Sequence, residues 1–352
     1  MTFLYKYKIL LFLFVFSLGF LSSFSLPPYN LFYLNFFSYP ALLWVLLLNS
    51  KNKIISFNLG WTFGFGFFIS NLYWLTNSLT FEDNFKTLIP FALILIPLFL
   101  GLFYAFPSLV FSVLKPKKNL LSILILATLI SIFEYIRSFI FSGFPWNLIA
   151  YSFVNYLEFI QILSVTGTYA FNSIIILIFF LPTIILFNIK INIKVSIFIF
   201  SLLIVLSNYF WGKFTLNQFA LTKKKDLGFT IKIISPKINI NRYFQDENPK
   251  EFISELISTS KPNPSDETIF ILPEGILSSI YFEDLKKFKN LFSNNFSKKH
   301  KIILGMNFYE NRKIYNSLLV VDNELNVLDK YNKNKLVPFG EFLPFETTLG
   351  KL

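Results

Sequence analysis

Long hydrophobic runs dominate the first 211 residues. Six of them contain no charged side chain and cover 9–26, 31–50, 54–81, 87–114, 159–189 and 195–212. A seventh apolar stretch, 119–141, is interrupted only by Glu134 and Arg137. Each run supplies about the 20 helical residues needed to cross a hydrocarbon core of roughly 30 Å. The pattern therefore predicts a polytopic α-helical membrane domain with about seven spans.

The hydrophobic pattern changes after residue 227. Strands are expected where short apolar or alternating runs occur, at 228–235, 268–272 and 301–305. Helical spacing separates them at 248–259 and 283–296. Two last apolar runs, 313–321 and 326–331, flank a polar turn and predict a hairpin. This succession predicts a mixed α/β layer fold.

Charge density supports two domains. Of the first 211 residues 15 are charged, against 37 of the remaining 141, and soluble domains are about a quarter charged. We predict a transmembrane domain at 1–211, a linker at 212–227 and a soluble domain at 228–352.

Residue usage excludes several functions. The net charge is +12, but only three of the 32 basic residues are Arg, so we attribute the charge to Lys-rich composition and expect no nucleic-acid partner. The chain has no Cys and a single His, His300, which argues against a zinc site. We expect neither a metal nor a cofactor.

Lysines between the runs predict the orientation. Nine lie in segments that would share one side of the membrane, against one, Lys86, in the short loops of the other side. By the positive-inside rule the nine are cytoplasmic. After seven crossings the N-terminus is inside and the soluble domain is outside.

Glu134 and Arg137 are three residues apart on one helical face, inside an apolar segment where a lone charge costs a few kcal/mol. We expect them to neutralise each other as a structural ion pair. A polar feature lining a substrate cavity is the alternative.

Two features of the soluble part could carry chemistry. Glu274 follows an apolar strand-like run, and catalytic groups often emerge at the carboxyl ends of strands in α/β sheets. The segment YNKNKLVPFGEFLP at 331–344 places Lys333, Lys335 and Glu341 in a stretch stiffened by prolines. An acid after a strand is more often a solvated loop residue, so these residues alone leave the site open.

These motifs resemble those of the bacterial apolipoprotein N-acyltransferase family. The resemblance covers nearly the whole chain, in the order LPPYN (26–30), GFGFF (64–68) running to YWL (73–75), EYIR (134–137), GFPW (143–146), LPE (272–274) and YNKNKLVPFGEFLP (331–344). It implies a polytopic membrane domain joined to a nitrilase-like, carbon-nitrogen hydrolase domain, a four-layer α/β sandwich.

The resemblance also implies a function in lipoprotein biosynthesis. A fatty acyl chain would move from a phospholipid to the N-terminal amine of a diacylglyceryl-cysteine apolipoprotein. The implied partners are those two substrates and the membrane, without a cofactor. The protein would be a monomer in the bacterial inner membrane, with its catalytic domain periplasmic.

Site residues follow from the same resemblance. The family uses a Glu-Lys-Cys triad and a thioester intermediate. Glu274 matches the general base, Lys333 the lysine that stabilises the oxyanion, and Glu341 a supporting glutamate. Lys335 stands where many relatives have His and receives no role. Phe244 is the nearest counterpart of a substrate-covering loop tryptophan, although a buried loop aromatic is an equal alternative.

The triad cysteine has no counterpart, because the 352 residues contain none. We therefore expect the N-terminal portion of a longer enzyme, with an incomplete nitrilase-like domain and no activity of its own. The alternatives are an inactive membrane scaffold or lipid-binding remnant, and a membrane-tethered nitrilase-type amidase, which the membrane-half matches disfavour.

Overall fold

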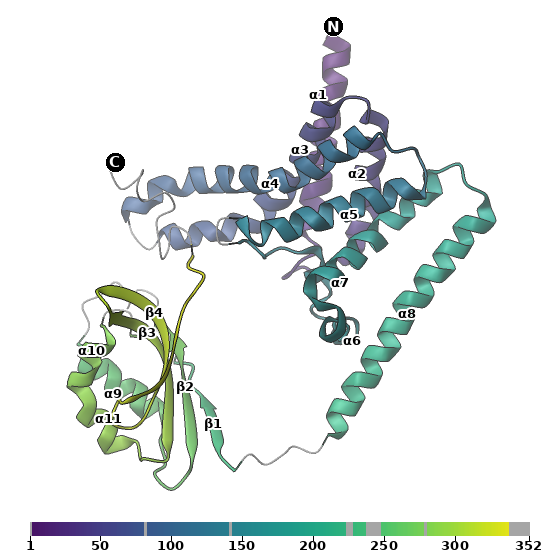
Figure 1. Cartoon of the computed structure of the whole chain (residues 1–352). Helices are drawn as coiled ribbons and strands as arrows, with labels where there is room; N and C mark the ends of the chain where they lie inside the picture. Colours follow the sequence, from purple (N-terminus) through teal and green to yellow (C-terminus); the bar gives the residue numbers. More distant parts are fainter. Residues whose placement is uncertain are drawn as a thin grey trace. The chain divides into compact units, whose positions relative to one another are not determined.

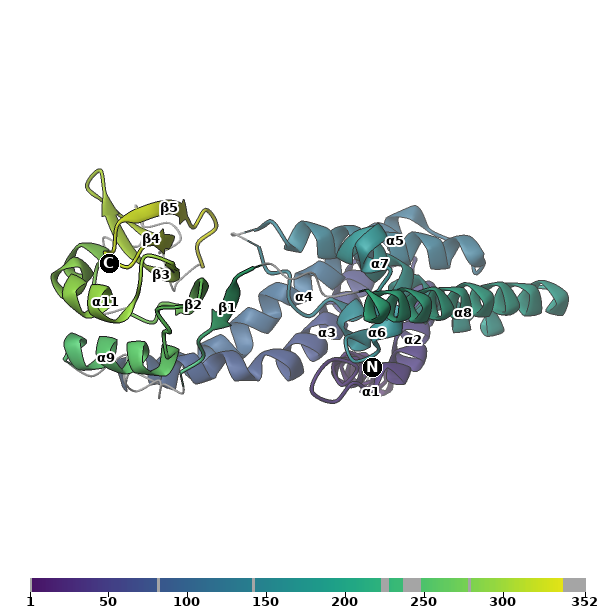
Figure 2. The same cartoon turned by 90° about the horizontal axis from the view of Figure 1, so that it is seen from below.

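The structure is a computed structural model that describes residues 2–80, 83–140, 143–222, 228–236, 248–277 and 280–337. It divides into two compact units, Met1–Thr222 and Lys223–Leu352. The first is helical, and the second contains a mixed sheet with helices (Figures 1 and 2).

All seven predicted apolar segments contain a long helix. These helices are α1 (Thr2–Ser23), α2 (Asn35–Asn49), α3 (Lys53–Leu72), α4 (Ile89–Leu114), α5 (Leu120–Arg137), α7 (Leu163–Phe180) and α8 (Ile191–Leu221). Short helical segments between them are η1 (Phe32–Leu34), η2 (Tyr73–Thr80), η3 (Asp83–Leu88), η5 (Ile149–Phe153), α6 (Leu157–Ile160) and η6 (Leu181–Leu186).

Helix length and hydropathy support a multi-pass membrane protein. In the part of the chain that the structure describes, five stretches are long and apolar enough to cross a membrane: Phe32–Asn49, Asp83–Leu114, Leu120–Arg137, Leu163–Leu186 and Ile191–Leu221. Tyr7–Ser23 is a shorter apolar helix. The count of seven spans remains a prediction.

Glycines allow α3 and α4 to pack closely. A Cβ added to Gly64 would lie 2.8 Å from the Cα of Gly101, and one added to Gly101 would lie 2.8 Å from the ring of Trp61. Lipid is as apolar as the side chains, so close backbone approach contributes much of the helix association energy in a membrane. The motif GFGFF therefore lies at a helix contact.

Glu134 and Arg137 do not form the predicted ion pair: no salt bridge joins them, although both are described and 0% and 1% exposed. The Glu134 carboxylate accepts hydrogen bonds from Tyr104 of α4 at 3.1 Å and from Asn172 of α7. Arg137 donates to the Trp146 carbonyl at 3.0 Å. The two side chains are neighbours on α5, yet they have different partners: the carboxylate meets donors from α4 and α7, whereas the guanidinium reaches the segment that contains Trp146.

The second unit has one five-stranded sheet in the order β1-β2-β3-β4-β5. Its strands are β1 (Thr230–Ile233), β2 (Thr268–Glu274), β3 (His300–Glu310), β4 (Lys313–Val321) and β5 (Val327–Asn332). The first three are parallel, and β4 and β5 are antiparallel to their neighbours. The connections contain α9 (Pro249–Ser260), α10 (Phe282–Leu285), η8 (Lys286–Phe288) and α11 (Lys289–Asn295).

The helices of this unit lie on one side of the sheet (Figure 1). Phe270, Ile302 and Leu319 are buried on that face with the apolar residues of α9. The opposite face is less covered: Ile233 is 76% exposed and Leu318 47% exposed. Successive strand residues point to opposite faces, so the sheet has one packed and one open apolar surface.

The predicted strands and hairpin are present, with two differences. β3 continues to Glu310 because Asn311 and Arg312, both with positive φ, turn it directly into β4. The helix predicted at 283–296 is divided into α10, η8 and α11. Apolar residues three apart, at 282, 285 and 288, match the 3₁₀ period better than the α period.

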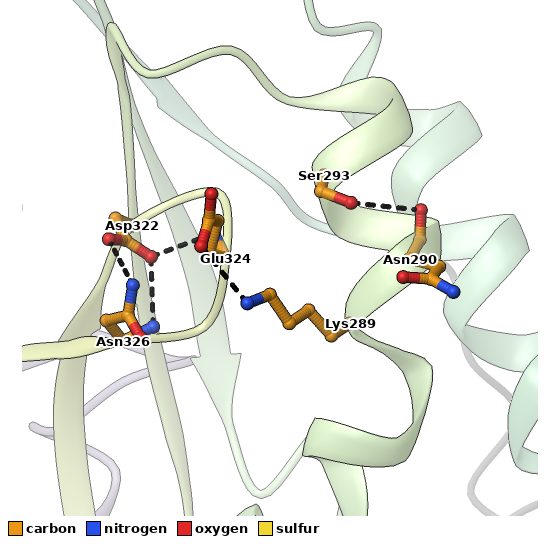
Figure 3. A network of polar contacts seen from close by, with 6 residues as sticks. All are labelled: Lys289, Asn290, Ser293, Asp322, Glu324 and Asn326. Carbon is orange, nitrogen blue, oxygen red and sulfur yellow. Dashed lines mark hydrogen bonds and ion pairs between the residues drawn. The ribbon is translucent and has the colours of Figure 1, made fainter.

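The turn between β4 and β5 is organised by Asp322 (Figure 3). Its Oδ1 accepts hydrogen bonds from the backbone N–H groups of Glu324 and Asn326 at 2.8 and 2.9 Å, and its Oδ2 from the Asn326 side chain at 2.9 Å. Lys289 of α11 pairs with Glu324 at 3.0 Å. The turn is thus fixed internally and tied to a helix.

Candidate functional site

Glu274 is the last residue of β2, at the carboxyl end of the parallel part of the sheet. The pairing of β2 with β3 shifts register between Ile271 and Glu274, across the segment that contains Pro273. Gly275 follows with φ of 67°, a conformation that favours glycine. The chain therefore turns sharply away and leaves the carboxylate at the strand end.

Lys333 and Asn316 both reach this carboxylate. Lys333 Nζ lies 3.2 Å from Glu274 Oε1, and Asn316 Nδ2 donates to the same oxygen at 2.8 Å. The backbone N–H of Lys333 donates to the Asn316 carbonyl at 2.8 Å, which holds the segment after β5 against β4. The end of β2, strand β4 and the segment after β5 thus each contribute one residue to a cluster, which we call the Glu274–Asn316–Lys333 cluster.

Gly305 makes room for this cluster. It is the residue of β3 that pairs with Glu274 of β2. The carbonyl oxygen of Gly305 also accepts a hydrogen bond from the backbone N–H of Gly275 at 3.1 Å. A Cβ at Gly305 would lie 2.9 Å from Glu274 Cα and 3.5 Å from Glu274 Cγ. Because β3 carries no side chain there, the carboxylate of β2 can meet an amide from β4, two strands away.

The cluster is accessible. The Glu274 side chain is 64% exposed and that of Lys333 is 30% exposed. A carboxylate can accept a proton, and a neighbouring ammonium can stabilise negative charge that develops on a reacting oxygen. In the described part of the chain, no group of three or more His, Cys, Asp or Glu side chains is arranged to hold a metal ion.

Sequence reasoning singled out Glu274 and Lys333, and the structure brings them together. Lys335 is exposed two residues farther along. Glu341 and Phe244 lie outside the described residues, so their predicted roles stay predictions.

Asn316 was not anticipated from the sequence. The local signal is no more than an amide side chain that follows Tyr315 in the first half of β4. Its importance depends on the order of the strands, which the local pattern does not specify.

Comparisons with known proteins extend the sequence resemblance. Residues 18–181 match the family described as the apolipoprotein N-acyltransferase N-terminal domain. Proteins named apolipoprotein N-acyltransferase match over most of the chain. That of Brucella melitensis biotype 1 is 25% identical over 95% of this chain and 65% of its own length.

Two further relatives carry the same name. The protein of Allorhizobium ampelinum is 28% identical over 95% of this chain and 65% of its own length. The protein of Rickettsia prowazekii is 28% identical over 98% of this chain and 68% of its own length. The chain therefore spans about two thirds of the length of these curated relatives, and the matches include both units.

Proposed function

The chain belongs to the apolipoprotein N-acyltransferase family, and on that premise we propose that it contributes to the N-acylation of lipoproteins. The acyl donor would be a phospholipid, and the acceptor the N-terminal amine of a diacylglyceryl-cysteine apolipoprotein. The contact of Glu274 with Lys333 at 3.2 Å is the observation that carries the proposal. It joins a proton acceptor and a fixed cation at an accessible strand end.

The first half-reaction would form a thioester. Glu274 takes the proton of a cysteine thiol, and the thiolate attacks the ester carbonyl of the phospholipid. Lys333 stabilises the resulting oxyanion. When the intermediate collapses, the lysophospholipid alkoxide leaves and receives the proton from Glu274.

The second half-reaction would transfer the acyl chain. The acceptor amine attacks the thioester carbonyl, Glu274 takes a proton from the attacking nitrogen, and Lys333 again stabilises the oxyanion. Collapse of the intermediate forms the amide and expels the cysteine thiolate, which regains a proton. Since the 352 residues contain no cysteine, the proposed nucleophile lies outside them.

We assign Asn316 a positioning role in this reaction. Its amide donates to the Glu274 oxygen that Lys333 also contacts. It can therefore hold the carboxylate in one orientation while the proton moves. Glu341 would support the site and Phe244 would cover the acyl chain, as the family resemblance implies.

The proposed architecture is a seven-span membrane domain at 1–211, a linker at 212–227 and a nitrilase-like four-layer sandwich that begins at 228. The open apolar face of the sheet, with Ile233 and Leu318 exposed, supports the sandwich, because such a face needs a second layer. We further propose an inner-membrane protein that acts as a monomer, with the second unit on the periplasmic side.

The first test is to read the gene beyond codon 352 for an in-frame cysteine codon. In the protein so encoded, Glu274→Gln should lower acyl-thioester formation from radiolabelled phospholipid by about 10² to 10⁴-fold. Lys333→Ala should lower it by about 10² to 10³-fold. The labelled protein band is measured on gels before and after hydroxylamine treatment, which cleaves thioesters.

Lys335→Ala is the matched control, because it removes a nearby lysine to which we assign no role. It should keep the thioester. The 352-residue chain alone should form none. Full labelling of Glu274→Gln or of Lys333→Ala, or loss of labelling in the Lys335→Ala control alone, would contradict the assigned roles.

A further inference from the structure

A large apolar groove lies within the first unit, between α8 and the rest of the helices. Its volume is about 910 Å³, and α8 forms one wall between Phe200 and Trp211. The other walls come from η1, α2, η5, α6 and α7. All the residues that line the groove belong to this unit, and none of them belongs to the Glu274–Asn316–Lys333 cluster.

Two contacts hold α8 at the ends of the groove. Toward its N-terminus, Lys194 Nζ donates to the carbonyl of Ile185 in η6 at 2.9 Å. Toward its C-terminus, Asn208 Nδ2 donates to the carbonyl of Phe159 in α6 at 3.0 Å. Gly212 lies so close to α6 that a Cβ there would collide with the backbone of Glu158. Between these two contacts α8 stands apart, and the groove results.

The kink in α7 adds to the opening. Gly167 has φ of 73° and ψ of 169°, which interrupts the helix beside the lining residues Val165 and Thr166. A Cβ at this position would meet no atom within 4 Å. The space beside the kink is therefore not filled by a neighbouring side chain.

The lining is almost entirely hydrocarbon and aromatic. None of the residues that line the groove is charged, and the aliphatic amide and hydroxyl side chains among them are Thr166, Ser207 and Asn208. Water in such a space would find few hydrogen-bond partners. Helix α8 is long and apolar enough to cross a bilayer, and in a bilayer the molecules that can occupy this groove are lipids.

The dimensions fit one leaflet. From Phe200 to Trp211, α8 rises by roughly 16 Å, at 1.5 Å per residue. Half of a hydrocarbon core is about 15 Å thick. An acyl chain of a lipid in one leaflet can therefore run along the groove without crossing the midplane.

The groove has a polar end. Ser207, Asn208 and Trp211 lie toward the C-terminal end of α8, whereas Phe200 and Leu203 lie toward its N-terminal end. Tyr156 lines the groove near α6, and tyrosine and tryptophan favour the headgroup level of a membrane. This order matches a lipid, with the chain at one end and the headgroup at the other.

Asn208 supplies a specific acceptor. Its Nδ2 is occupied by Phe159, whereas its Oδ1 is buried and has no hydrogen-bond partner in the described part of the chain. A buried acceptor without a partner costs about 1–3 kcal/mol, so a donor from a bound molecule would be favourable. No carboxylate lines the groove, so it offers no counterion to the cationic N-terminus of an apolipoprotein.

We propose that this groove binds one bilayer phospholipid whose headgroup carries a hydrogen-bond donor, such as phosphatidylethanolamine, with an acyl chain along Phe200 to Ile204 and the headgroup near Asn208. This lipid site goes beyond the acyl-transfer reaction and does not depend on it. It would also fix α8 against the other helices, since the lipid fills the space between them.

The test uses the 352-residue chain in nanodiscs that contain phosphatidylethanolamine with a photoreactive diazirine in one acyl chain. After irradiation, labelled peptides are mapped by mass spectrometry. Leu203→Trp fills the groove, and Leu202→Trp places the same side chain beside it without lining it. Both residues are about half exposed, at 55% and 46%, so both changes should be tolerated.

We expect Leu203→Trp to lower labelling of the α7 lining peptide about tenfold, which corresponds to roughly 1.4 kcal/mol, and Leu202→Trp to leave it unchanged. Equal labelling in the two variants would mean ordinary lipid contact around the helix and would overturn the site.

The headgroup assignment is tested by competition. Unlabelled phosphatidylethanolamine should displace the probe at lower concentration than phosphatidylcholine with the same chains, and Asn208→Leu should remove that difference. Equal competition in the wild-type chain would overturn the role of Asn208. Stronger displacement by a diacylglyceryl lipopeptide would overturn the choice of a phospholipid.

Discussion

Gly305 has no functional group, yet it determines whether Glu274 can meet Asn316. The glycine lies on β3 between the strands that carry the two side chains, and its missing Cβ leaves a passage across the sheet. Gly305 would therefore affect the proposed reaction indirectly, through the position that it allows the Glu274 side chain to take.

Gly305→Ala tests this dependence. The new Cβ would lie 2.9 Å from Glu274 Cα, so the β2 terminus must shift. In the protein with its cysteine, we expect acyl-thioester formation to fall by about 10²-fold, the effect of a misplacement of about 1 Å.

Met306→Leu is the control, since it changes the next, buried residue of β3 while conserving volume. It should leave the thioester rate within about twofold. An unchanged rate in Gly305→Ala, with the sheet intact by circular dichroism, would show that Glu274 does not need this passage.

At the scale of elements, the β4–β5 turn shows how one carboxylate fixes a connection. Partial burial by itself raises the pKa of the Asp322 carboxyl, but the hydrogen bonds from Asn326 and from the Glu324 N–H outweigh it and lower the pKa below the usual value. A depressed pKa in the folded state means that the charged form stabilises the fold. That contribution is present above the unfolded pKa of about 3.9 and is lost as the pH falls through the lower, folded value.

Asp322→Ala should therefore lower the free energy of unfolding of the second unit by about 1 kcal/mol at pH 7. The difference from the wild type should shrink below about pH 4, where the wild-type carboxyl becomes protonated. Pulse proteolysis in urea measures this free energy, because it reports the unfolded fraction of a chosen unit.

Asp322→Asn serves as the control, because it keeps one acceptor oxygen without a titrating charge. Its stability relative to Asp322→Ala should not depend on pH between 3 and 7. A difference between wild type and Asp322→Ala that is the same at pH 3 and pH 7 would exclude the charged turn as the cause.

At the scale of the whole molecule, the proposed orientation would link the two units in the proposed function. Both proposed substrates are anchored in a membrane, so a second unit on the proposed outer side would meet them in two dimensions. The excess of lysine on one side of the predicted spans favours an N-terminus in the cytoplasm and a second unit outside.

Reporter fusions test this orientation. Alkaline phosphatase, which is active only outside the cytoplasm, should be active when fused after residue 222, and green fluorescent protein fused there should be dark. Fusions after residue 52, between Lys51 and Lys53, should give the opposite result. Fluorescence from the fusion after residue 222 would place the second unit in the cytoplasm and refute the outward placement.

The sequence by itself located the helices of the first unit and the strands of the second, and it singled out Glu274 and Lys333 as candidate site residues. The helices and strands were predictable because hydrophobic periodicity is a local property, and the turn signal Asp322-Asn323-Glu324-Leu325 is local as well. Glu274 and Lys333 were found through motifs shared with a family, because nothing in their spacing of 59 residues indicates contact.

Only the tertiary structure decided what lies beside these elements. Asn316 and Gly305 enter the site because β3 and β4 follow β2 in the sheet, and strand order is set by packing of the whole unit. Glu134 and Arg137 are neighbours on one helix, yet they have separate partners. Side chains of α4 and α7 donate to Glu134, and the carbonyl of Trp146 accepts from Arg137. The groove beside α8 arises in the same way, since two contacts 14 residues apart on α8 determine where that helix leaves its neighbours.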